Sequence, residues 1–518
     1  MNATSRPDVI IVGSGVGGGT TALRLAGHGL SVLMLERGDY LPKEDDNWSP
    51  QAVYIDRKYT ARETWLDGAD RSFHPSVFYN VGGATKFFGC TMIRFRERDF
   101  EDLEHHGGLS PSWPISYGDL EPYYEQAEHL FHTMGTQGID PTEPRRANPF
   151  PYSGVRSDPP MEALSARLRA QGLRPFPQHA AIHMPPHGNC VRCGTCDGYP
   201  CRIGAKADAE RSVVAPALAS GRVTLRTGTV ARRVLLSPDG KQVTGIEVEQ
   251  GGHVEVLTAG IYVLAASAIN SAAILLRSAT DKAPRGAANS SDVVGRHYMA
   301  HNNTAMMAIS TRRNPTVFQK TVTINDFYFG DDAFRYPMGC IMSLGKLKPG
   351  MMTAANPLVP KLVNRMLSDR SYDWWIMSED LPDPGNRVSI SGDTIKMDVR
   401  RNNLRAHTEL TKRAARAMRR AGLPLTLTKL MPVATTSHQC GTVRFGNDPA
   451  KAALDPFCRT FDHSNLFVVD ASFFPSSAAV NPALTIAAQA LRVSDHIAAA
   501  DFGISARTTN PLRKTNHV

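Results

Sequence analysis

The chain has 518 residues and a formal net charge of +9, with 42% hydrophobic and 21% charged residues. A chain of this length buries a large core without disulfides or metals, and this composition excludes a fibrous or disordered protein. The Lys and Arg residues are scattered, with no long basic run and no nucleic-acid motif, so we expect no nucleic-acid partner. An anionic cofactor, or solubility alone, accounts for the excess positive charge.

The amino terminus and the cysteines indicate the cellular compartment. Residues 1–8 are polar and lead straight into an apolar strand, without the charged start and cleavage site of a secretory signal. No apolar stretch approaches the length needed to cross a bilayer. Of the 8 cysteines, half lie in one short loop and half are isolated, unlike the framework of a secreted disulfide scaffold. We therefore expect a cytoplasmic protein with no membrane association.

The first forty residues predict a strand, a glycine turn, a helix and a second strand. Residues 9–12 are β-branched, which is typical of a buried parallel strand, and they end at a GxGxxG turn over residues 13–18. Residues 19–29 carry apolar side chains at helical spacing, and residues 31–35 predict a strand that ends in Glu36.

Each part of this pattern has a task in binding a dinucleotide. Gly13 allows the tight turn, Gly15 lets the backbone approach a pyrophosphate, and Gly18 lets the helix pack closely on the strand. The helix N-terminus offers free N–H groups to phosphate. Glu36 can accept hydrogen bonds from ribose hydroxyls. A chance glycine-rich turn is the rival interpretation, and NAD and FAD both satisfy the pattern at this point.

A returning strand and helix near the carboxyl end suggest that one nucleotide-binding domain uses both ends of the chain. Residues 466–470 predict the strand, and Asn481-Pro482 opens an Ala-rich helix over residues 486–500. Between the two ends, residues 321–329 alternate as a sheet strand should, and residues 404–421 predict an amphipathic basic helix.

Together these segments resemble the glucose-methanol-choline (GMC) oxidoreductase family of FAD enzymes, and the resemblance covers most of the chain. It rests on the order and spacing of the segments 13–36, 80–85, 228–232, 262–271, 294–301, 384–388, 437–442 and 481–485. The segment 113–124 and the Asn481-Pro482 pair look most like the sugar-oxidising branch, which includes pyranose oxidases and bacterial glycoside 3-oxidases.

The resemblance implies an α/β fold with two domains. A Rossmann-like FAD-binding domain is expected from the discontinuous segments 1–98, 206–298 and 432–500, and an α+β substrate domain with an antiparallel sheet from residues 301–431. Residues 99–205 are expected to be an insertion or lid that carries the cysteine-rich loop, and residues 501–518 a flexible tail.

The same resemblance assigns the site. His438 is expected to be the base that takes the hydroxyl proton, because a neutral imidazole can accept it while flavin N5 takes the hydride. Asn481 is expected to donate its amide N–H to the developing alkoxide. The rival interpretations are an ordinary hydrogen-bonded histidine, an Asn-Pro turn, and a helix cap for Asp470. The residues expected to bind the cofactor are Gly13, Ser14, Gly15, Gly18, Glu36, Arg37, Gly83, Thr85, Val230, Ala266, Asp470, Ala471, Pro482 and Thr485.

Two departures from the family pattern shape the expected chemistry. Fungal pyranose oxidases attach FAD through a histidine in the glycine-rich segment, and this chain has residues 85–88 (Thr-Lys-Phe-Phe) there, which implies non-covalent FAD. The threonine that follows in those enzymes is Gly89 here, which bears on the handling of oxygen.

The expected function is oxidation of a secondary hydroxyl, at C2 or C3 of a pyranose or glycoside, to the keto sugar, with oxygen reduced to hydrogen peroxide. The alternative is an FAD-dependent sugar or alcohol dehydrogenase that passes electrons to a quinone or a protein. A dinucleotide-binding module without enzyme activity is a third class, and His438 and Asn481 argue against it. The particular sugar, its hydroxyl and the oligomeric state do not follow from the sequence.

Four cysteines at positions 190, 193, 196 and 201 have the spacing CxxCxxCx4C, which invites a metal or iron–sulfur interpretation. A similar loop occurs in flavoenzymes of this family, with a cluster in some electron-transferring relatives and without metal in others. A structural zinc site normally spaces its pairs farther apart, so we expect structural thiols and no metal.

Overall fold

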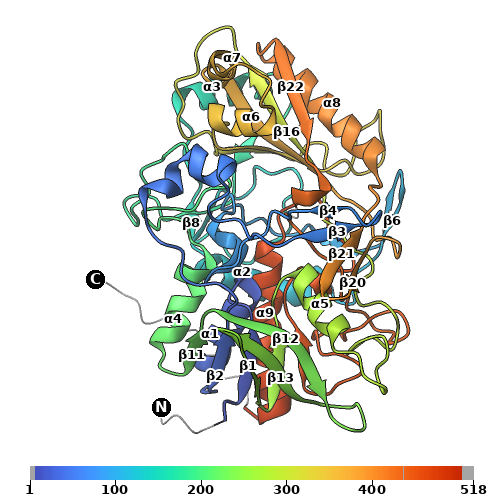
Figure 1. Ribbon diagram of the computed structural model, residues 1–518. Coiled ribbons are helices and arrows are strands. Elements are labelled where there is room, and N and C mark those ends of the chain that lie inside the picture. The colour runs from blue at the N-terminus through green and yellow to red at the C-terminus, as the bar shows by residue number, and fades with distance from the viewer. Residues whose placement is uncertain (1–5, 436, 505–518) are drawn as a thin grey trace.

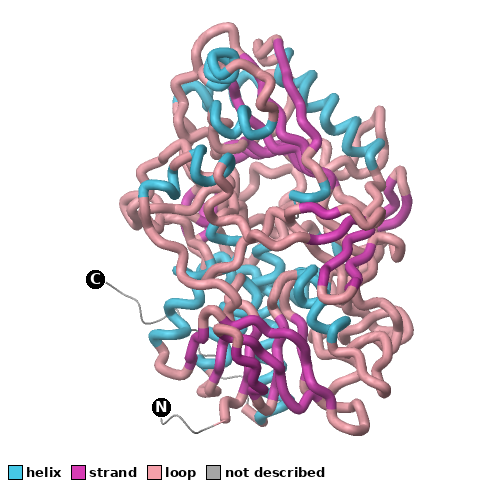
Figure 2. Tube along the Cα trace, in the orientation of Figure 1, coloured by secondary structure: helices cyan, strands magenta, loops and turns pink. Residues whose placement is uncertain are grey.

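The computed structural model describes residues 6–435 and 437–504. Figure 1 shows two sheet-containing halves, with α1 and α9 in the lower half and α8 in the upper half. Figure 2 shows that loops make up much of the region between the two halves. A fold of this mixed kind, with a parallel sheet in one half and an antiparallel sheet in the other, confirms the expected α/β class.

The lower half is built on a parallel sheet that collects strands from distant parts of the chain. Its strand order is β11-β2-β1-β15-β23, and every pair is parallel. The strands are β1 (Val9–Val12), β2 (Val32–Leu35), β11 (Val223–Arg226), β15 (Ile261–Leu264) and β23 (Leu466–Val468). All four residues of β1 are buried, as expected for a strand that is covered on both faces. The expectation that both ends of the chain share one sheet is confirmed.

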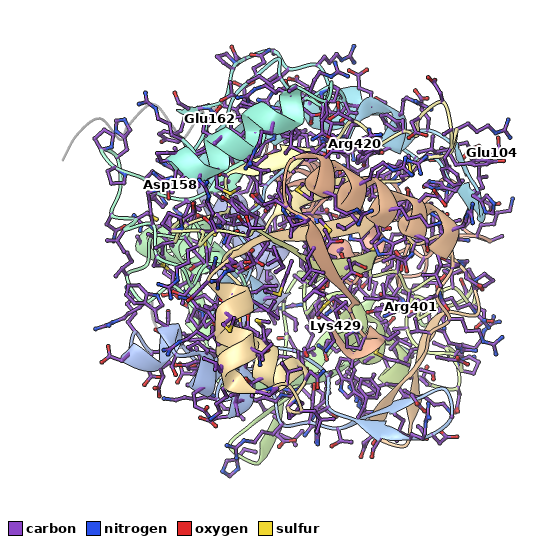
Figure 3. All side chains as sticks on the ribbon, turned by 90° about the horizontal axis from the view of Figure 1, so that it is seen from above. Glu104, Asp158, Glu162, Arg401, Arg420 and Lys429 are labelled. Atoms are coloured by element: carbon purple, nitrogen blue, oxygen red, sulfur yellow. The ribbon has the colours of Figure 1, made fainter. Side chains whose placement is uncertain are left out.

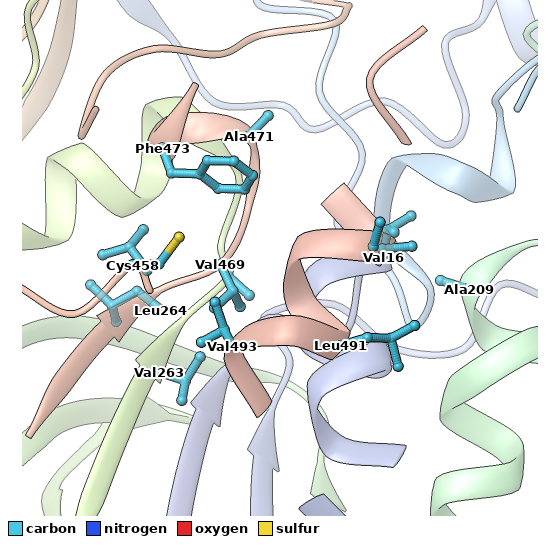
Figure 4. Close-up of a cluster of buried hydrophobic side chains, with 14 of the residues drawn as sticks. Val16, Ala209, Val263, Leu264, Cys458, Val469, Ala471, Phe473, Leu491 and Val493 are labelled. Atoms are coloured by element: carbon cyan, nitrogen blue, oxygen red, sulfur yellow. The ribbon is translucent and has the colours of Figure 1, made fainter. Parts of the chain in front are cut away.

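Two helices cover this sheet and hold the chain ends together. Helix α1 (Val16–Gly27) begins three residues earlier than expected, directly after the glycine turn, and packs against α9 (Ala483–Phe502). Figure 4 shows Leu491 and Val493 of α9 among side chains of α1 and the sheet. Helix α9 ends at Phe502, so the first residues of the expected tail are helical, and residues 505–518 of that tail lie outside the described residues.

An antiparallel ribbon and a helix complete the lower half. The ribbon has the order β12-β13-β14, and α5 packs against its first strand. The bounds are β12 (Thr229–Leu236), β13 (Val243–Gln250), β14 (His253–Leu257) and α5 (Ala268–Arg277).

The upper half is an antiparallel sheet with the order β22-β16-β19-β18-β17-β9. Its strands are β22 (Leu425–Leu430), β16 (Asn302–Ile309), β19 (Ser371–Ser378), β18 (Cys340–Ser343), β17 (Val322–Ile324) and β9 (Phe176–Pro177). The strand expected over residues 321–329 is shorter than predicted, because the chain turns after Ile324 and the N–H of Tyr328 bonds to the carbonyl of Asn325.

One face of this upper sheet is covered by two helices. The expected basic helix is α8 (Leu404–Arg420), and α3 (Pro159–Arg169) joins it in one buried cluster with the sheet. Figure 3, seen from above, shows the two helices side by side over the strands. Because these helices close one face, the opposite face of the sheet is free to line a cavity.

The sheets interleave the segments that the sequence was expected to keep in separate domains. Strand β9 comes from the expected insertion and joins the upper sheet. Strands β3 (Trp65–Asp67) and β4 (Ser72–Phe73) come from the amino-terminal segment and extend β20 (Arg387–Ser391) and β21 (Thr394–Asp398). Sheets that join segments from different expected domains do not show where one domain ends and the next begins, so the domain boundaries given above stay a prediction.

The remaining α-helices and strands lie mostly in the connecting regions. They are β5 (Leu103–His105), β6 (Gly108–Ser110), β7 (Thr133–Gly135), β8 (Tyr152–Ser153), β10 (Ala180–Ala181), α2 (Tyr117–Leu130), α4 (Ala215–Ala219), α6 (Pro349–Ala355) and α7 (Lys361–Ser368). Within residues 6–435 and 437–504, no helix combines the length and apolar character that a bilayer crossing requires.

The contact of α1 with the glycine turn gives a stability prediction. Gly18→Ala should lower the thermal midpoint of unfolding, because the new Cβ would collide with the carbonyl oxygen of Gly13 and press on the Ala265 side chain. Overpacking of this kind costs about 1–3 kcal/mol. Gly27→Ala in the same helix is the matched control, since a Cβ there meets no atom within 4 Å. Equal melting temperatures for the two variants would contradict the predicted close contact.

Candidate active site

A cavity of about 1230 Å³ lies between the two halves, and both contribute to its wall. Val12 and Leu35, at the carboxyl ends of β1 and β2, line it from below, and Met307 and Trp375 of the upper sheet line it from above. Ligands of open α/β sheets bind at the carboxyl ends of the strands. The volume exceeds the roughly 300–1,000 Å³ of an ordinary small-molecule pocket, so there is room for a dinucleotide and a second ligand.

The glycine turn is shaped to receive an anion. Gly15 is the N-cap of α1, no side chain caps the helix, and its first turn has no acidic residue. A Cβ on Gly15 would meet nothing within 4 Å, while one on Gly83 would lie 3.1 Å from the Cα of Gly15. The free N–H groups of the first turn therefore open onto the cavity, which fits the pyrophosphate of a dinucleotide.

Glu36 follows β2 at the edge of the same cavity. Its carboxylate accepts hydrogen bonds from the backbone N–H (3.1 Å) and hydroxyl (2.5 Å) of Ser14 and from the N–H of Gly38 (3.0 Å). Burial raises the pKa of Glu36 above its usual value, and the bonds from Ser14 and Gly38 oppose that shift. These bonds tie the acid to the glycine turn, where a ribose next to the pyrophosphate would lie.

Most residues expected to bind the cofactor lie in the cavity wall. Those that line it are Gly13, Ser14, Gly15, Glu36, Arg37, Gly83, Thr85, Val230, Ala266, Asp470, Ala471 and Pro482. Gly18 lies beneath the turn, against Gly13. Thr485 is buried, and its hydroxyl pairs with that of Tyr124 at 2.8 Å, away from the wall. The structure thus brings together all but two of the set.

Asp470 caps a short helix as well as lining the cavity. Its carboxylate accepts from the N–H of Ser472 at 2.9 Å and from the hydroxyls of Ser472 and Ser271. Burial raises its pKa. The helix-cap interpretation is therefore what the hydrogen bonds show, and a contact with the cofactor stays a proposal.

His438 and Asn481, which are 43 residues apart, meet at the cavity. The Nδ2 of Asn481 lies 3.1 Å from the Nε2 of His438, and the Oδ1 of Asn481 is buried without a hydrogen-bond partner among the described residues. His438 is half-buried, and its loss of hydration, with smaller effects from His301 and Lys320, lowers its pKa to about 3. The imidazole is therefore neutral at ordinary pH and able to accept a proton.

A third residue, His301, completes this group. Its Nδ1 lies 3.1 Å from the Nδ1 of His438, and its Nε2 lies 3.0 Å from the carbonyl oxygen of Ser477. His301 lies within the segment 294–301. The sequence gives no signal that assigns His301 to the site, because 137 residues separate it from His438.

The upper sheet presents an apolar row to the cavity. Ala305 on β16, Trp375 on β19 and Met342 on β18 are cross-strand neighbours, so their side chains share one face. Met307 and Leu427 form a second pair on that face. Met351, Met352, Val359 and Leu367, in or beside α6 and α7, line the same part of the cavity.

An ion pair occupies the space beside Gly89. The Nζ of Lys320 lies 2.6 Å from the carboxylate of Asp197, and a Cβ on Gly89 would collide with that carboxylate and come within 2.5 Å of the ammonium. The absence of a side chain at position 89 thus makes room for Lys320, which is almost fully buried.

The cysteine-rich loop forms part of the wall through Cys196. Cys90 and Lys206 beside it, despite burial, lower the pKa of Cys196 to about 7. Polar groups contact the other thiols, as in the 3.4 Å bond from the N–H of Arg192 to Cys190. In the described ranges, no group of three or more His, Cys, Asp or Glu side chains is arranged to hold a metal ion.

Comparison with known proteins identifies the family. The GMC oxidoreductase family matches residues 76–303 and 382–490, and an FAD binding domain matches residues 8–42. The chain is 32% identical to 6'''-hydroxyparomomycin C oxidase of Streptomyces lividus over 95% of its length and 91% of the relative's. It is 31% identical to paromamine 6'-oxidase of Streptomyces fradiae, with 95% and 91% covered. It is 28% identical to the large subunit of fructose dehydrogenase of Gluconobacter japonicus, with 96% and 98% covered.

The fold agrees with this assignment. The crystal structure of pyridoxine 4-oxidase from Mesorbium loti superposes with a TM-score of 0.66 at 19% identity, covering 95% of this chain and 99% of the other. With this fold, a cavity shaped for a dinucleotide and family matches across both halves, the chain belongs to the GMC oxidoreductase family and has an FAD-binding domain at its amino terminus.

Proposed function

We propose that this protein uses non-covalent FAD to oxidise a secondary hydroxyl, at C2 or C3 of a pyranose or glycoside, to the keto sugar. The observation that carries the proposal is the contact between His438 Nε2 and Asn481 Nδ2 at 3.1 Å in the cavity wall. It supports one basic nitrogen and one amide donor acting on the same substrate oxygen.

Bound FAD would supply the acceptor for the hydride that leaves the alcohol carbon. The substrate hydroxyl would replace Asn481 at the single lone pair of His438 Nε2, which would accept the hydroxyl proton, while the N–H of Asn481 released in this way would hold the oxygen on which negative charge develops. Because the pKa of His438 is lowered to about 3, its imidazole takes the proton only as the loss of hydride makes the hydroxyl acidic. The low pKa also keeps the base unprotonated in moderately acidic solution.

The names of the relatives support a carbohydrate substrate. Paromamine 6'-oxidase acts at a 6' position, and fructose dehydrogenase acts on fructose. The relatives therefore differ in the substrate that they oxidise. The choice of C2 or C3 rests on the resemblance of this sequence to the sugar-oxidising branch. The apolar row on the upper sheet supports a substrate larger than a free monosaccharide, with an aromatic group attached to the sugar.

We propose oxygen as the electron acceptor and the cytoplasm as the place of action. Lys320, which is paired with Asp197 at 2.6 Å, is a buried cation whose N–H groups would favour the negative charge that develops as oxygen is reduced. All 8 cysteines are free, which agrees with a reducing compartment. The alternative acceptor is a quinone or a protein, and Gly89 and the cysteine-rich loop keep that alternative open.

The central test is anaerobic bleaching of the flavin by a panel of free sugars, O-glycosides and C-glycosides, with identification of the keto product. His438→Ala should slow flavin reduction about 10²- to 10⁴-fold, since that is the contribution of a general base. His253→Ala, at an exposed position on β14, is the control. A His438→Ala enzyme that keeps most of its rate would overturn the assignment, and flavin that stays in the precipitate after acid denaturation would show covalent attachment.

The pH dependence follows from the lowered pKa of His438. Activity that needs neutral His438 is present above its pKa and is lost only as pH falls toward about 3. We expect the rate of flavin reduction to show no acid limb from His438 between about pH 5 and pH 8, because an unperturbed histidine titrates near 6.5. An acid limb near 6.5 that His438→Ala abolishes would contradict this.

The acceptor is tested by peroxide yield. We expect hydrogen peroxide to form in equal amount to the sugar oxidised, and Lys320→Met to slow reoxidation by oxygen more than it slows reduction by sugar. Rapid reduction of a quinone with little peroxide would instead identify a dehydrogenase.

The apolar row predicts substrate preference. An aryl glucoside should have a higher kcat/KM than methyl glucoside, and Met342→Ala should reduce that ratio about tenfold or less, as expected for loss of one apolar contact. Met306→Ala, on the opposite face of the same sheet, is the matched control. A ratio unchanged in Met342→Ala would exclude the row from substrate binding.

A further inference from the structure

We propose that His301 is a positioning residue that fixes the tautomer of His438, so that the lone pair of His438 lies on Nε2 and faces Asn481. The proposal rests on the function proposed above and names the residue on which the base depends.

The carbonyl group of Ser477 determines which atom donates in each of the hydrogen bonds of His301. The oxygen of Ser477 only accepts, so the Nε2 of His301 at 3.0 Å must carry the hydrogen and donate it. A neutral imidazole has one N–H, which leaves the Nδ1 of His301 as an acceptor. The Nδ1 of His438, 3.1 Å away, therefore donates to it.

The same logic settles the other side of His438. With its hydrogen on Nδ1, the neutral ring has a bare Nε2, and the amide Nδ2 of Asn481 at 3.1 Å donates to that nitrogen. The opposite tautomer would set an N–H of His438 against the NH2 group of Asn481, which is a clash of two donors. Four groups thus form one directed chain, from Asn481 through His438 and His301 to the carbonyl of Ser477.

The backbone around His301 is held in an unusual conformation. His301 has φ +63°, in the left-handed region that β-carbon-bearing residues avoid. The carboxylate of Asp380 accepts from the N–H of Ala300 at 2.8 Å and from the N–H of His301 at 2.9 Å. The hydroxyl of Ser477 lies 3.2 Å from the same carboxylate. Strain that the surroundings hold in place concentrates at functional sites.

Ser477 and Asn481 lie on one loop that enters α9. This loop therefore supplies both ends of the chain: the carbonyl that orients His301 and the amide that meets His438. The ring of His438 is therefore oriented relative to the loop that carries Asn481, its hydrogen-bond partner. The backbone of this loop thus sets the spacing between the two ends of the chain of hydrogen bonds.

The two acids near the histidine pair lie on the side of His301. The carboxylate of Asp380 accepts two backbone N–H bonds there, and the carboxylate of Glu379 contacts His105 and Ser110. On the side of His438, Lys320 and His301 both lower its pKa, after the larger effect of burial. Removing His301 therefore raises the pKa of His438 while also freeing its tautomer.

The test compares His301→Leu with His301→Gln in the FAD-loaded enzyme. Leucine has no acceptor for the Nδ1–H of His438, so flavin reduction at saturating sugar should fall about 10- to 100-fold, by analogy with the loss of the group that orients a metal-ligating histidine. Glutamine can accept from His438 through its Oε1 and donate to Ser477 through its amide, so it should recover most of the rate. The acid limb should move to higher pH in His301→Leu, and KM should change less than kcat.

A measurement without substrate separates this proposal from the function itself. In protein labelled with 15N-histidine, NMR should show a proton on Nδ1 and none on Nε2 of His438, assigned by comparison with His438→Asn. A proton on Nε2 in the wild-type enzyme would overturn the proposal, as would equal losses of rate in the leucine and glutamine variants. If the tautomer is as expected and no sugar bleaches the flavin, the proposed function fails and the positioning role of His301 stands.

Discussion

The site depends on the parallel pairing of β1 with β15 and of β15 with β23, which sets strands from three distant segments side by side. Parallel strands end at one edge of a sheet, so the glycine turn after β1 and the loop after β23 open on the same side. Without that pairing, nothing in the sheet would bring the uncapped start of α1 close to the loop that carries Asn481. The packing of α9 on α1 then fixes their separation through buried apolar side chains (Figure 4).

Burial decides the electrostatics once the geometry is set. Loss of hydration raises the pKa of Glu36 and Asp470 and lowers that of His438. The acids are tied to Ser14, Gly38, Ser271 and Ser472. His438 alone among these three presents an unprotonated nitrogen beside a donor, and this difference separates the cofactor-binding groups from the proposed base.

The sequence predicted the parts of the fold whose signal is local. The strand at residues 9–12, the glycine turn and the basic helix over residues 404–421 all follow from periodicity and turn chemistry, and the structure confirms them within a few residues. The strand over residues 321–329 was predicted too long, because the turn at Asn325 depends on hydrogen bonds that periodicity does not show. Pairing between segments, as of β3 with β21, is a long-range choice, and it blurs the predicted domain limits.

The candidate site divides in the same way. His438, Asn481 and most of the glycine-turn set were predicted because each lies in a motif, and the structure places them around one cavity. His301, Lys320 and the apolar row on the upper sheet were not assigned, because their roles arise from cross-strand register and from contacts between segments far apart in the chain. Thr485 was assigned from its motif but is turned toward Tyr124 by the packing of α2 on α9.

The most direct test of the central claim is a crystal structure of the enzyme with FAD and an unreactive sugar analogue. The account predicts that one hydroxyl of the analogue lies within about 3 Å of both His438 Nε2 and Asn481 Nδ2, which is hydrogen-bonding reach for a base and a donor, with its carbon facing the isoalloxazine ring. A bound sugar that contacts the ring while the imidazole of His438 points away from it would contradict the mechanism.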